Sequence, residues 1–226
     1  MDVNNKTHIN ANGVVQPEKK EFNTSFVILG ISPFSSKFTF DNILKIVQWA
    51  ENNTSEYRLF IPDKPTIYSL KSLGYESKKA EKKASKQIRY LKNKCMSALK
   101  MVNRHTSQEE IIDYSFLENN ERFCRRLNQI IGLYSKCEDF GNACDEFSKV
   151  FLESKSIIPS KAAIRYSSMY LVYELPIFIC ANEIFGTENA SFMYPTCPKF
   201  VREILQNKLS LDMKVDQEFI EYSIRN

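Results

Sequence analysis

The most constraining feature of the chain is the segment from Ser25 to Ile31, in which apolar residues occupy consecutive positions. Such a run is typical of a strand that is buried on both faces of a parallel sheet. A helix with apolar residues at helical spacing follows from Asn42 to Glu51, with Asp41 as its predicted cap, and Tyr57 to Ile61 suits a second strand. This order predicts a βαβ unit. We therefore expect an α/β fold, a Rossmann-like parallel sheet flanked by helices.

The remainder of the sequence contains more helical than strand patterns. Helical spacing of apolar residues recurs in the segments Lys78 to Val102, Ser107 to Ile112, Glu118 to Tyr134, Ala143 to Ser154, Ala163 to Phe185 and Pro198 to Gln206. Periodicity leaves open whether a short strand lies at Ile131 to Tyr134 or near Ile157. Alternation from Lys214 to Ile220 suits an edge strand.

The length of 226 residues favours a single domain with a substantial core. Residues 1–21 are rich in asparagine, lysine and threonine and have almost no apolar content. This composition predicts a disordered N-terminal tail, followed by one domain at residues 22–226.

The composition favours a cytoplasmic protein. No apolar stretch approaches the roughly 20 residues that span a bilayer, and no secretory signal precedes the six cysteines. The cysteines lack the CxxC spacing of metal and redox sites, so we expect reduced thiols and no metal. The net charge of +4 is small, which makes the local distribution of charge more informative than its sum.

Positive charge is concentrated in the predicted helix from Lys78 to Val102. Nine lysines and arginines lie between Lys78 and Lys100, with Glu81 as the one acid. One helix face carries the apolar residues Ala80, Ala84, Ile88, Leu91, Cys95 and Leu99. The opposite face carries Lys78, Lys79, Lys82, Lys86, Arg89 and Lys100. A solvated surface helix is one interpretation, but like charges at i,i+4 cost roughly 0.2–0.5 kcal/mol a pair, which suggests a polyanionic partner whose phosphates this face contacts.

Ser32 is the candidate nucleophile, because it lies where the first predicted strand meets Pro33. Its hydroxyl should lie at the carboxyl edge of the sheet, where α/β folds bind ligands, and Gly30 would let a substrate approach the backbone closely. A serine and a proline after a strand also form an ordinary turn. The two histidines, His8 and His105, and the absence of a GxSxG motif disfavour a Ser-His-Asp hydrolase. The electrophile should therefore be an activated ester.

Tyr170 and Glu174 lie four residues apart and share one face of an otherwise apolar predicted helix. A carboxylate in such surroundings is costly unless it is paired or hydrogen-bonded. Glu174 could bind a substrate ammonium and later accept its proton, or it could be a partly exposed residue without a role in chemistry. Tyr194, which opens a predicted loop with Pro195, would by itself be assigned to packing.

These elements together resemble the cyclodipeptide synthases, from about residue 22 onward. The resemblance rests on Gly30-Ile31-Ser32-Pro33, the basic helix, Tyr170-xxx-Glu174-Leu175-Pro176 and Tyr194-Pro195, in this order. It implies an enzyme that joins the aminoacyl groups of two aminoacyl-tRNAs into a cyclic dipeptide, with a fold similar to the catalytic domain of class I tyrosyl- and tryptophanyl-tRNA synthetases. The sequence has no His-Ile-Gly-His-type or Lys-Met-Ser-Lys-Ser-type motif, so we expect no ATP and no cofactor.

The resemblance also implies residue roles. Ser32 matches the serine that takes the first aminoacyl group, Tyr170 and Glu174 match the pair that holds its amino group, and Tyr194 matches a tyrosine near the reacting centre. Ser35 and Pro195 stand where many members have asparagine and histidine, which implies the family's Tyr-Pro subset and a different hydrogen-bond arrangement around the serine. The residues that flank the motifs and are expected to line the first pocket are Ile28, Gly30, Ile177 and Phe178.

The implied mechanism is ping-pong. Ser32 takes the first aminoacyl group, the second aminoacyl-tRNA offers its amine to give a dipeptidyl-enzyme, and the dipeptide's free amine releases the cyclic product. The basic helix would contact tRNA. Two alternatives remain open, a non-catalytic tRNA-binding module that needs neither Ser32 nor Glu174, and a serine ester hydrolase that does not need the basic face.

Overall fold

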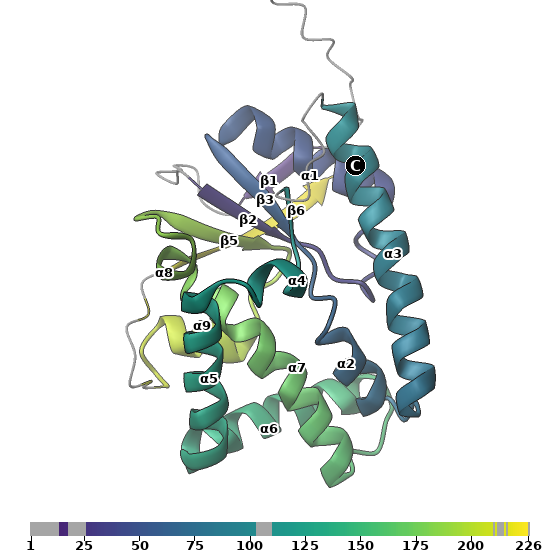
Figure 1. The fold of residues 1–226 in the computed structure, drawn as a ribbon, viewed down its shortest axis with the longest axis vertical. Coiled ribbons are helices and arrows are strands. Elements are labelled where there is room, and N and C mark those ends of the chain that lie inside the picture. The colour runs from purple at the N-terminus through teal and green to yellow at the C-terminus, as the bar shows by residue number, and fades with distance from the viewer. Residues whose placement is uncertain are drawn as a thin grey trace, which may run out of the picture.

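A computed structural model of the chain describes residues 14–17, 26–102, 110–209, 211, 215 and 217–225. Within this part of the chain, six strands form one sheet in the order β1-β6-β5-β2-β3-β4 (Figure 1). β1 pairs antiparallel with β6, and the other four pairings are parallel. The sheet confirms the predicted Rossmann-like fold. In chain order, the strands are β1 (Val14–Pro17), β2 (Phe26–Gly30), β3 (Glu56–Phe60), β4 (Ile111–Ile112), β5 (Ala190–Tyr194) and β6 (Glu218–Arg225).

β2 lies in the middle of the sheet, and all five of its residues are buried. A strand without polar side chains can be covered on both faces, as the consecutive apolar positions predict. β2 is followed by α1 (Phe40–Asn53) and β3, which confirms the βαβ unit. The cap of α1 was wrongly predicted. Thr39 is the N-cap and its hydroxyl accepts a hydrogen bond from the Asn42 amide at 3.2 Å, whereas Asp41 lies in the first turn.

One face of the sheet is covered by α1 and α3 (Ser77–Met101). Val27 and Leu29 of β2 share a buried cluster with residues of both helices, among them Ile46 and Leu91. The bounds of α3 differ by one residue at each end from the predicted helix. Its apolar stripe is buried as expected, and α3 runs along the side of the molecule in Figure 1.

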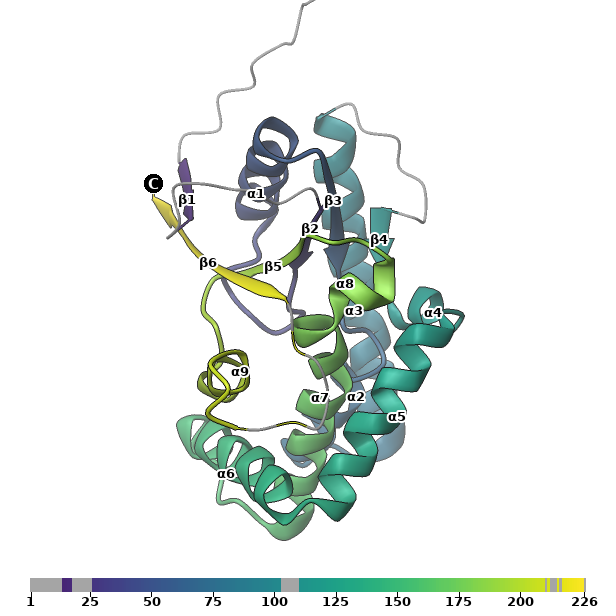
Figure 2. The ribbon, with the colours of Figure 1, turned by 90° about the vertical axis from the view of Figure 1, so that its left-hand side faces the viewer.

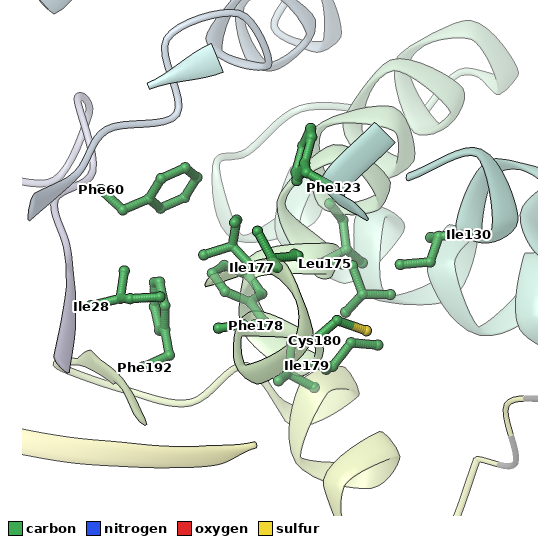
Figure 3. Packing of buried hydrophobic residues seen from close by; sticks show 14 of the residues in the cluster. Ile28, Phe60, Phe123, Ile130, Leu175, Ile177, Phe178, Ile179, Cys180 and Phe192 are labelled. Carbon is green, nitrogen blue, oxygen red and sulfur yellow. The ribbon is translucent and has the colours of Figure 1, made fainter. Parts of the chain in front are cut away.

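The opposite face of the sheet is covered by α7 (Lys161–Ile179). In Figure 3, side chains of the sheet, including Ile28 and Phe192, point toward Phe178 of α7, and side chains of α5 lie beyond α7. Figure 2 shows that this group of helices extends below the sheet. The helices around α7 are α2 (Thr66–Ser72), α4 (Tyr114–Leu117), α5 (Glu121–Lys136), α6 (Glu138–Ser154), α8 (Ala181–Phe185) and α9 (Lys199–Leu205).

The ends of the sheet depart from the sequence predictions. Val14–Pro17, expected in a disordered tail, form β1, which pairs with β6. Residues 1–13 and 18–25 lie outside the described residues. Because β1 covers the outer side of β6, the strand predicted at Lys214 to Ile220 is not an edge strand, and it begins later, at Glu218.

Both predicted positions for a short internal strand were wrong. Ile131 to Tyr134 lies inside α5, and Ile157 lies in the connection between α6 and α7. The helical assignment of Ser107 to Ile112 was also wrong at its end, where Ile111–Ile112 form β4, and residues 107–109 are not described. A strand of two residues shows no period, and β4 is defined by its pairing with β3.

The predicted helix from Ala163 to Phe185 is divided at Cys180 into α7 and α8. The Cys180 backbone leaves the helical region, with φ −131° and ψ 19°. All six cysteines have free thiols, and four of them are buried. None of the helices in the described part of the chain combines the length and apolar character that a bilayer span requires.

Candidate active site

Ser32 lies just beyond the carboxyl end of β2 and is partly buried. The Ile31 amide donates to the Phe60 carbonyl at 2.9 Å, so the backbone remains attached to β3 up to the residue before the serine. Gly30 is closely covered by rings of β5. A Cβ at this position would lie 2.6 Å from Phe192 Cζ and 2.9 Å from Tyr194 Cδ2. The glycine therefore brings the β2 backbone close to both rings.

Tyr170 and Glu174 face the site from α7. The Tyr170 hydroxyl donates a hydrogen bond to Glu174 Oε1 at 3.0 Å. Glu174 is 8% exposed. Burial raises the pKa of Glu174 to about 8, while the hydrogen bond from Tyr170 acts to lower it. Burial, and then the neighbouring Glu174, raise the pKa of Tyr170 well above its ordinary value. The carboxyl group of Glu174 is therefore mostly protonated at neutral pH, and the hydroxyl of Tyr170 keeps its proton.

Tyr194 is the last residue of β5, beside the end of β2. Burial, and then the nearby Glu174, raise the pKa of Tyr194 to about 12, while the side chain of Ser32 acts to lower it. The ring lies against Phe38, with the centroids 5.7 Å apart. Tyr194 is therefore a neutral hydroxyl beside the candidate nucleophile.

One cavity of about 410 Å³ is lined by Ser32, Tyr170, Glu174 and Tyr194. This volume is within the range of small-molecule sites. The charged residues that line the cavity are Glu174, Lys37 and Lys155. The walls are rich in aromatic residues, among them Phe60, Phe147, Phe151, Phe178, Phe192 and Phe219. The cavity thus brings together the hydroxyl of Ser32, the protonated carboxyl group of Glu174 and the phenols of Tyr170 and Tyr194 in largely apolar surroundings.

The predicted pocket residues divide into two groups. Gly30, Ser35 and Phe178 line the cavity, whereas Ile28, Ile177 and Pro195 do not. Ile28 lies deeper along β2, and Ile177 of α7 packs in the same buried cluster, so both are fully buried in the core (Figure 3). The structure corrects the expectation that these two line the pocket.

The matching family model is that of the cyclodipeptide synthases, and it covers residues 21–221. The chain belongs to the cyclodipeptide synthase family. Members of this family are aminoacyl-tRNA-dependent aminoacyltransferases that form cyclic dipeptides from aminoacyl-tRNAs.

Similar curated proteins are cyclo(L-leucyl-L-leucyl) synthases. The one from Staphylococcus haemolyticus is 30% identical over 200 residues, which are 86% of this chain and 85% of that protein. The one from Bacillus subtilis is 23% identical over 203 residues, 86% of this chain and 80% of that protein.

Solved cyclodipeptide synthase structures share the fold. The Staphylococcus haemolyticus structure has a TM-score of 0.82 and 28% identity, covering 95% of this chain and all of that one. A structure from Bacillus thermoamylovorans has a TM-score of 0.81 and 24% identity, and the match covers 95% of this chain and 97% of that one. A Mycobacterium tuberculosis protein, described as related to type I tRNA synthetases, has a TM-score of 0.78 and 19% identity, covering 92% of each chain.

The basic helix of this cyclodipeptide synthase is α3. Its six predicted tRNA-binding residues, Lys78, Lys79, Lys82, Lys86, Arg89 and Lys100, are exposed, and none of them lines the cavity. α3 packs against α2, which contributes Ser69 to the cavity wall. Lys92 points inward and forms an ion pair with Asp113, which ties α3 to the β4–α4 connection. The basic face is thus separate from the cavity.

Several cavity residues of this synthase escaped the sequence analysis. Phe147 and Phe151 come from α6, and Phe192 comes from β5, which was not predicted. The alternation of Ala190, Phe192 and Tyr194 was the signal that could have revealed β5. Among the described residues, no group of three or more histidine, cysteine, aspartate or glutamate side chains has the arrangement of a metal site.

Proposed function

We propose that this chain makes its cyclic dipeptide by a ping-pong mechanism through an aminoacyl ester on Ser32. The observation that carries the proposal is the convergence of Ser32, Tyr170, Glu174 and Tyr194 on one cavity. Three separate parts of the fold, the loop after β2, α7 and β5, supply these side chains. The described residues that line the cavity include no histidine, which is compatible with this chemistry because an aminoacyl-tRNA ester is already activated.

In the first step, Ser32 Oγ attacks the ester carbonyl of the first aminoacyl-tRNA. The bond to the ribose oxygen breaks, and the ribose oxygen leaves with the proton that the serine loses. Tyr194 lines the same cavity as Ser32 and interacts with it, so its hydroxyl can relay that proton. A phenol with a pKa near 12 stays protonated on average, so it serves as a relay between serine and leaving group.

Glu174 and Tyr170 hold the amino group of the substrate. A carboxyl group with a pKa of about 8 is mostly protonated at pH 7, and an incoming amine can take this proton to form an ammonium–carboxylate pair. The ammonium–carboxylate pair carries the same number of protons as the neutral amine and the protonated carboxyl group did before they met. The buried carboxyl group is therefore able to bind the amine and later to receive a proton from it.

The second step requires the amine on the enzyme to attack. If the amine of the second aminoacyl-tRNA attacked the Ser32 ester, the dipeptide would be formed on tRNA. A dipeptidyl-enzyme forms when the amine of the Ser32-bound residue attacks the ester of the second aminoacyl-tRNA. The attacking amine is thus that of the residue on Ser32, and the expectation that the second aminoacyl-tRNA supplies the amine was wrong. The new terminal amine then attacks the Ser32 ester, which closes the ring and returns a proton to the serine.

Leucine is our first candidate for the amino acids. Similar synthases are named for cyclo(L-leucyl-L-leucyl), and the aromatic cavity walls suit an apolar side chain. We also propose that the chain belongs to the Tyr-Pro subset of the family. Ser35, which occupies the place of asparagine, accepts a hydrogen bond from the Lys37 amide at 3.3 Å, and Pro195 has no amide hydrogen to donate.

The experiment that tests the function is incubation of the purified chain with charged and uncharged tRNA, followed by mass spectrometry. A synthase forms a cyclic dipeptide from charged tRNA alone, and intact-protein mass spectra contain one added aminoacyl group. A tRNA-binding module would bind both tRNAs and form no product. An ester hydrolase would release free amino acid and would also cleave small esters, without any cyclic product.

A further inference from the structure

Phe34 is an aromatic residue at the cavity that remains exposed. It lies two residues after Ser32, lines the cavity and is 41% exposed. The other aromatic residues of the wall are partly or fully buried, and Phe178 at 7% and Phe192 at 1% are among the buried ones. No other part of the described fold fully covers the ring of Phe34. It is available to a flat ligand group.

Lys37 lies in the same loop and also lines the cavity. The loop is held by hydrogen bonds to the carbonyls of Lys37 and of the next residue, Phe38. The Lys37 carbonyl accepts from Asn42 Nδ2 at 2.8 Å, and the Phe38 carbonyl accepts from Lys94 Nζ at 3.2 Å. The Lys37 side chain itself is exposed. The backbone of the loop thus presents a lysine in a fixed place beside the cavity.

The electrostatic balance at the cavity favours an anion. Lys37 and Lys155 are the cations among the lining residues, and Glu174 is the acid. Burial raises the pKa of Glu174 to about 8, so this carboxyl group contributes little negative charge at pH 7. The field around the cavity is therefore set mainly by the two lysines.

The reaction fixes where the nucleoside must lie. The leaving oxygen belongs to the ribose of the 3′-terminal adenosine and must lie next to Ser32 Oγ when the ester is attacked. Two residues of chain span at most about 7 Å, so the backbone of Phe34 is within that distance of Ser32. With the aminoacyl group in the buried part of the cavity, the adenosine would lie at its exposed side, where Phe34 and Lys37 are found.

We propose that Phe34 and Lys37 form the binding site for the 3′-terminal nucleotide of the aminoacyl-tRNA, with Phe34 stacked on the adenine and Lys37 in contact with its 5′ phosphate. The proposal rests on the proposed function, because it takes aminoacyl-tRNA as the donor to Ser32. Stacking of this kind accepts any base, and the terminal sequence common to tRNAs requires no discrimination here. The site would position every donor in the same way, whatever amino acid it carries.

The test is direct binding of a 5′-labelled CCA trinucleotide, measured by fluorescence anisotropy. Phe34→Ala should raise the dissociation constant about 5- to 150-fold, the range expected for loss of one base–aromatic stack. Phe34→Trp should retain binding. Lys37→Ala should raise the dissociation constant and lower the slope of log affinity against log salt by about 0.7, the value for one phosphate contact on a single strand.

A second measurement separates this site from the chemistry. In Phe34→Ala and Lys37→Ala, labelling of Ser32 by a simple aminoacyl ester without a nucleoside should fall much less than acylation of Ser32 by aminoacyl-tRNA. Tyr166→Ala is the matched control, because Tyr166 is a similarly exposed aromatic residue, at 37%, that does not line the cavity. It should leave both measurements unchanged.

The outcomes are distinguishable. Equal binding of CCA by wild type and Phe34→Ala would overturn the proposal. It would also be overturned if Phe34→Ala reduced labelling by the simple ester as much as acylation by aminoacyl-tRNA, because Phe34 would then belong to the aminoacyl pocket. Binding of CCA that depends on Phe34 supports the proposal even when no acyl-enzyme forms. In that last case the function proposed above fails, and the nucleotide site stands.

Discussion

The Tyr170 hydroxyl donates a hydrogen bond to the Glu174 carboxyl group at 3.0 Å, one helical turn away on α7. Glu174 is buried and Tyr170 is partly buried at the cavity, and burial raises the pKa of each. The carboxyl group of Glu174 is therefore mostly neutral at pH 7, and the hydroxyl of Tyr170 is its hydrogen-bond donor. An entering amine therefore meets a proton source that becomes its counter-ion.

Ser32→Ala should abolish both the cyclic product and the trapped acyl-enzyme, because a methyl group cannot form the ester. The measurement is intact-protein mass spectrometry after brief incubation with charged tRNA. Ser36→Ala removes a hydroxyl from the same loop and should keep the acyl-enzyme. Full product formation by Ser32→Ala would exclude the covalent mechanism.

Glu174→Gln should fold and lose activity by about 100-fold or more, the usual contribution of a positioned acid or base. A neutral amide forms no ion pair with an ammonium and accepts no proton from it. Product formation at several concentrations of charged tRNA measures the effect. Glu146→Gln changes an exposed glutamate of α6 and serves as the control. Normal turnover in Glu174→Gln together with lower stability would make Glu174 a structural residue.

Glu174 should make the protein less stable as the pH rises from about 5 to 8. Its pKa is about 8 in the folded protein and near 4.5 when unfolded. The folded state binds more protons between these values, so the free energy of unfolding falls by up to about 1.4 kcal/mol per pH unit. This stabilising contribution is complete below pH 4.5 and is lost as the pH passes 8. Urea unfolding of wild type and Glu174→Gln at pH 5, 6.5 and 8 measures it. Parallel curves would contradict the raised pKa.

Gly30→Ala should lower the free energy of unfolding by about 1–3 kcal/mol and slow acylation of Ser32. The added Cβ would lie under 3 Å from the rings of Phe192 and Tyr194, so both must move. Urea unfolding and the rate of Ser32 labelling are the two measurements. Gly132→Ala is the control, since no atom lies within 4 Å of its added Cβ. Inside α5 it should stabilise by up to about 1 kcal/mol. Unchanged stability and labelling in Gly30→Ala would show that the contact is easily relieved.

Replacing Lys82, Lys86 and Arg89 by alanine should weaken tRNA binding and lower its salt dependence. The slope of log affinity against log salt should fall by up to about 0.9 for each lost contact, and by less on single-stranded RNA. These side chains lie opposite the buried stripe of α3, so folding should be little affected.

A matched variant removes three exposed lysines elsewhere, Lys136, Lys149 and Lys161, and should keep the wild-type slope. Labelling of Ser32 by a simple aminoacyl ester should persist in both triple variants. An unchanged slope after loss of the three α3 cations would mean that tRNA binds on another surface.

The elements predicted well from the sequence are those with a strong local pattern. β2 is uniformly apolar, and α3 has a long apolar stripe opposite its cations, so the polarity of neighbouring residues along the chain was enough to locate them. The motifs around Ser32 and Tyr170 were visible for the same reason. Each lies within a few residues of a recognisable element end or helix face.

Pairing between distant segments decided the rest. β4 and β1 are defined by the strands beside them, β3 and β6, and no period in two or four residues could reveal them. The cavity likewise brings together Ser32 of the β2 loop, Phe147 of α6 and Glu174 of α7. A sequence pattern records which face of an element is buried. It does not record which element covers that face, and that choice, made by packing of the whole chain, formed the site and raised the pKa of Glu174.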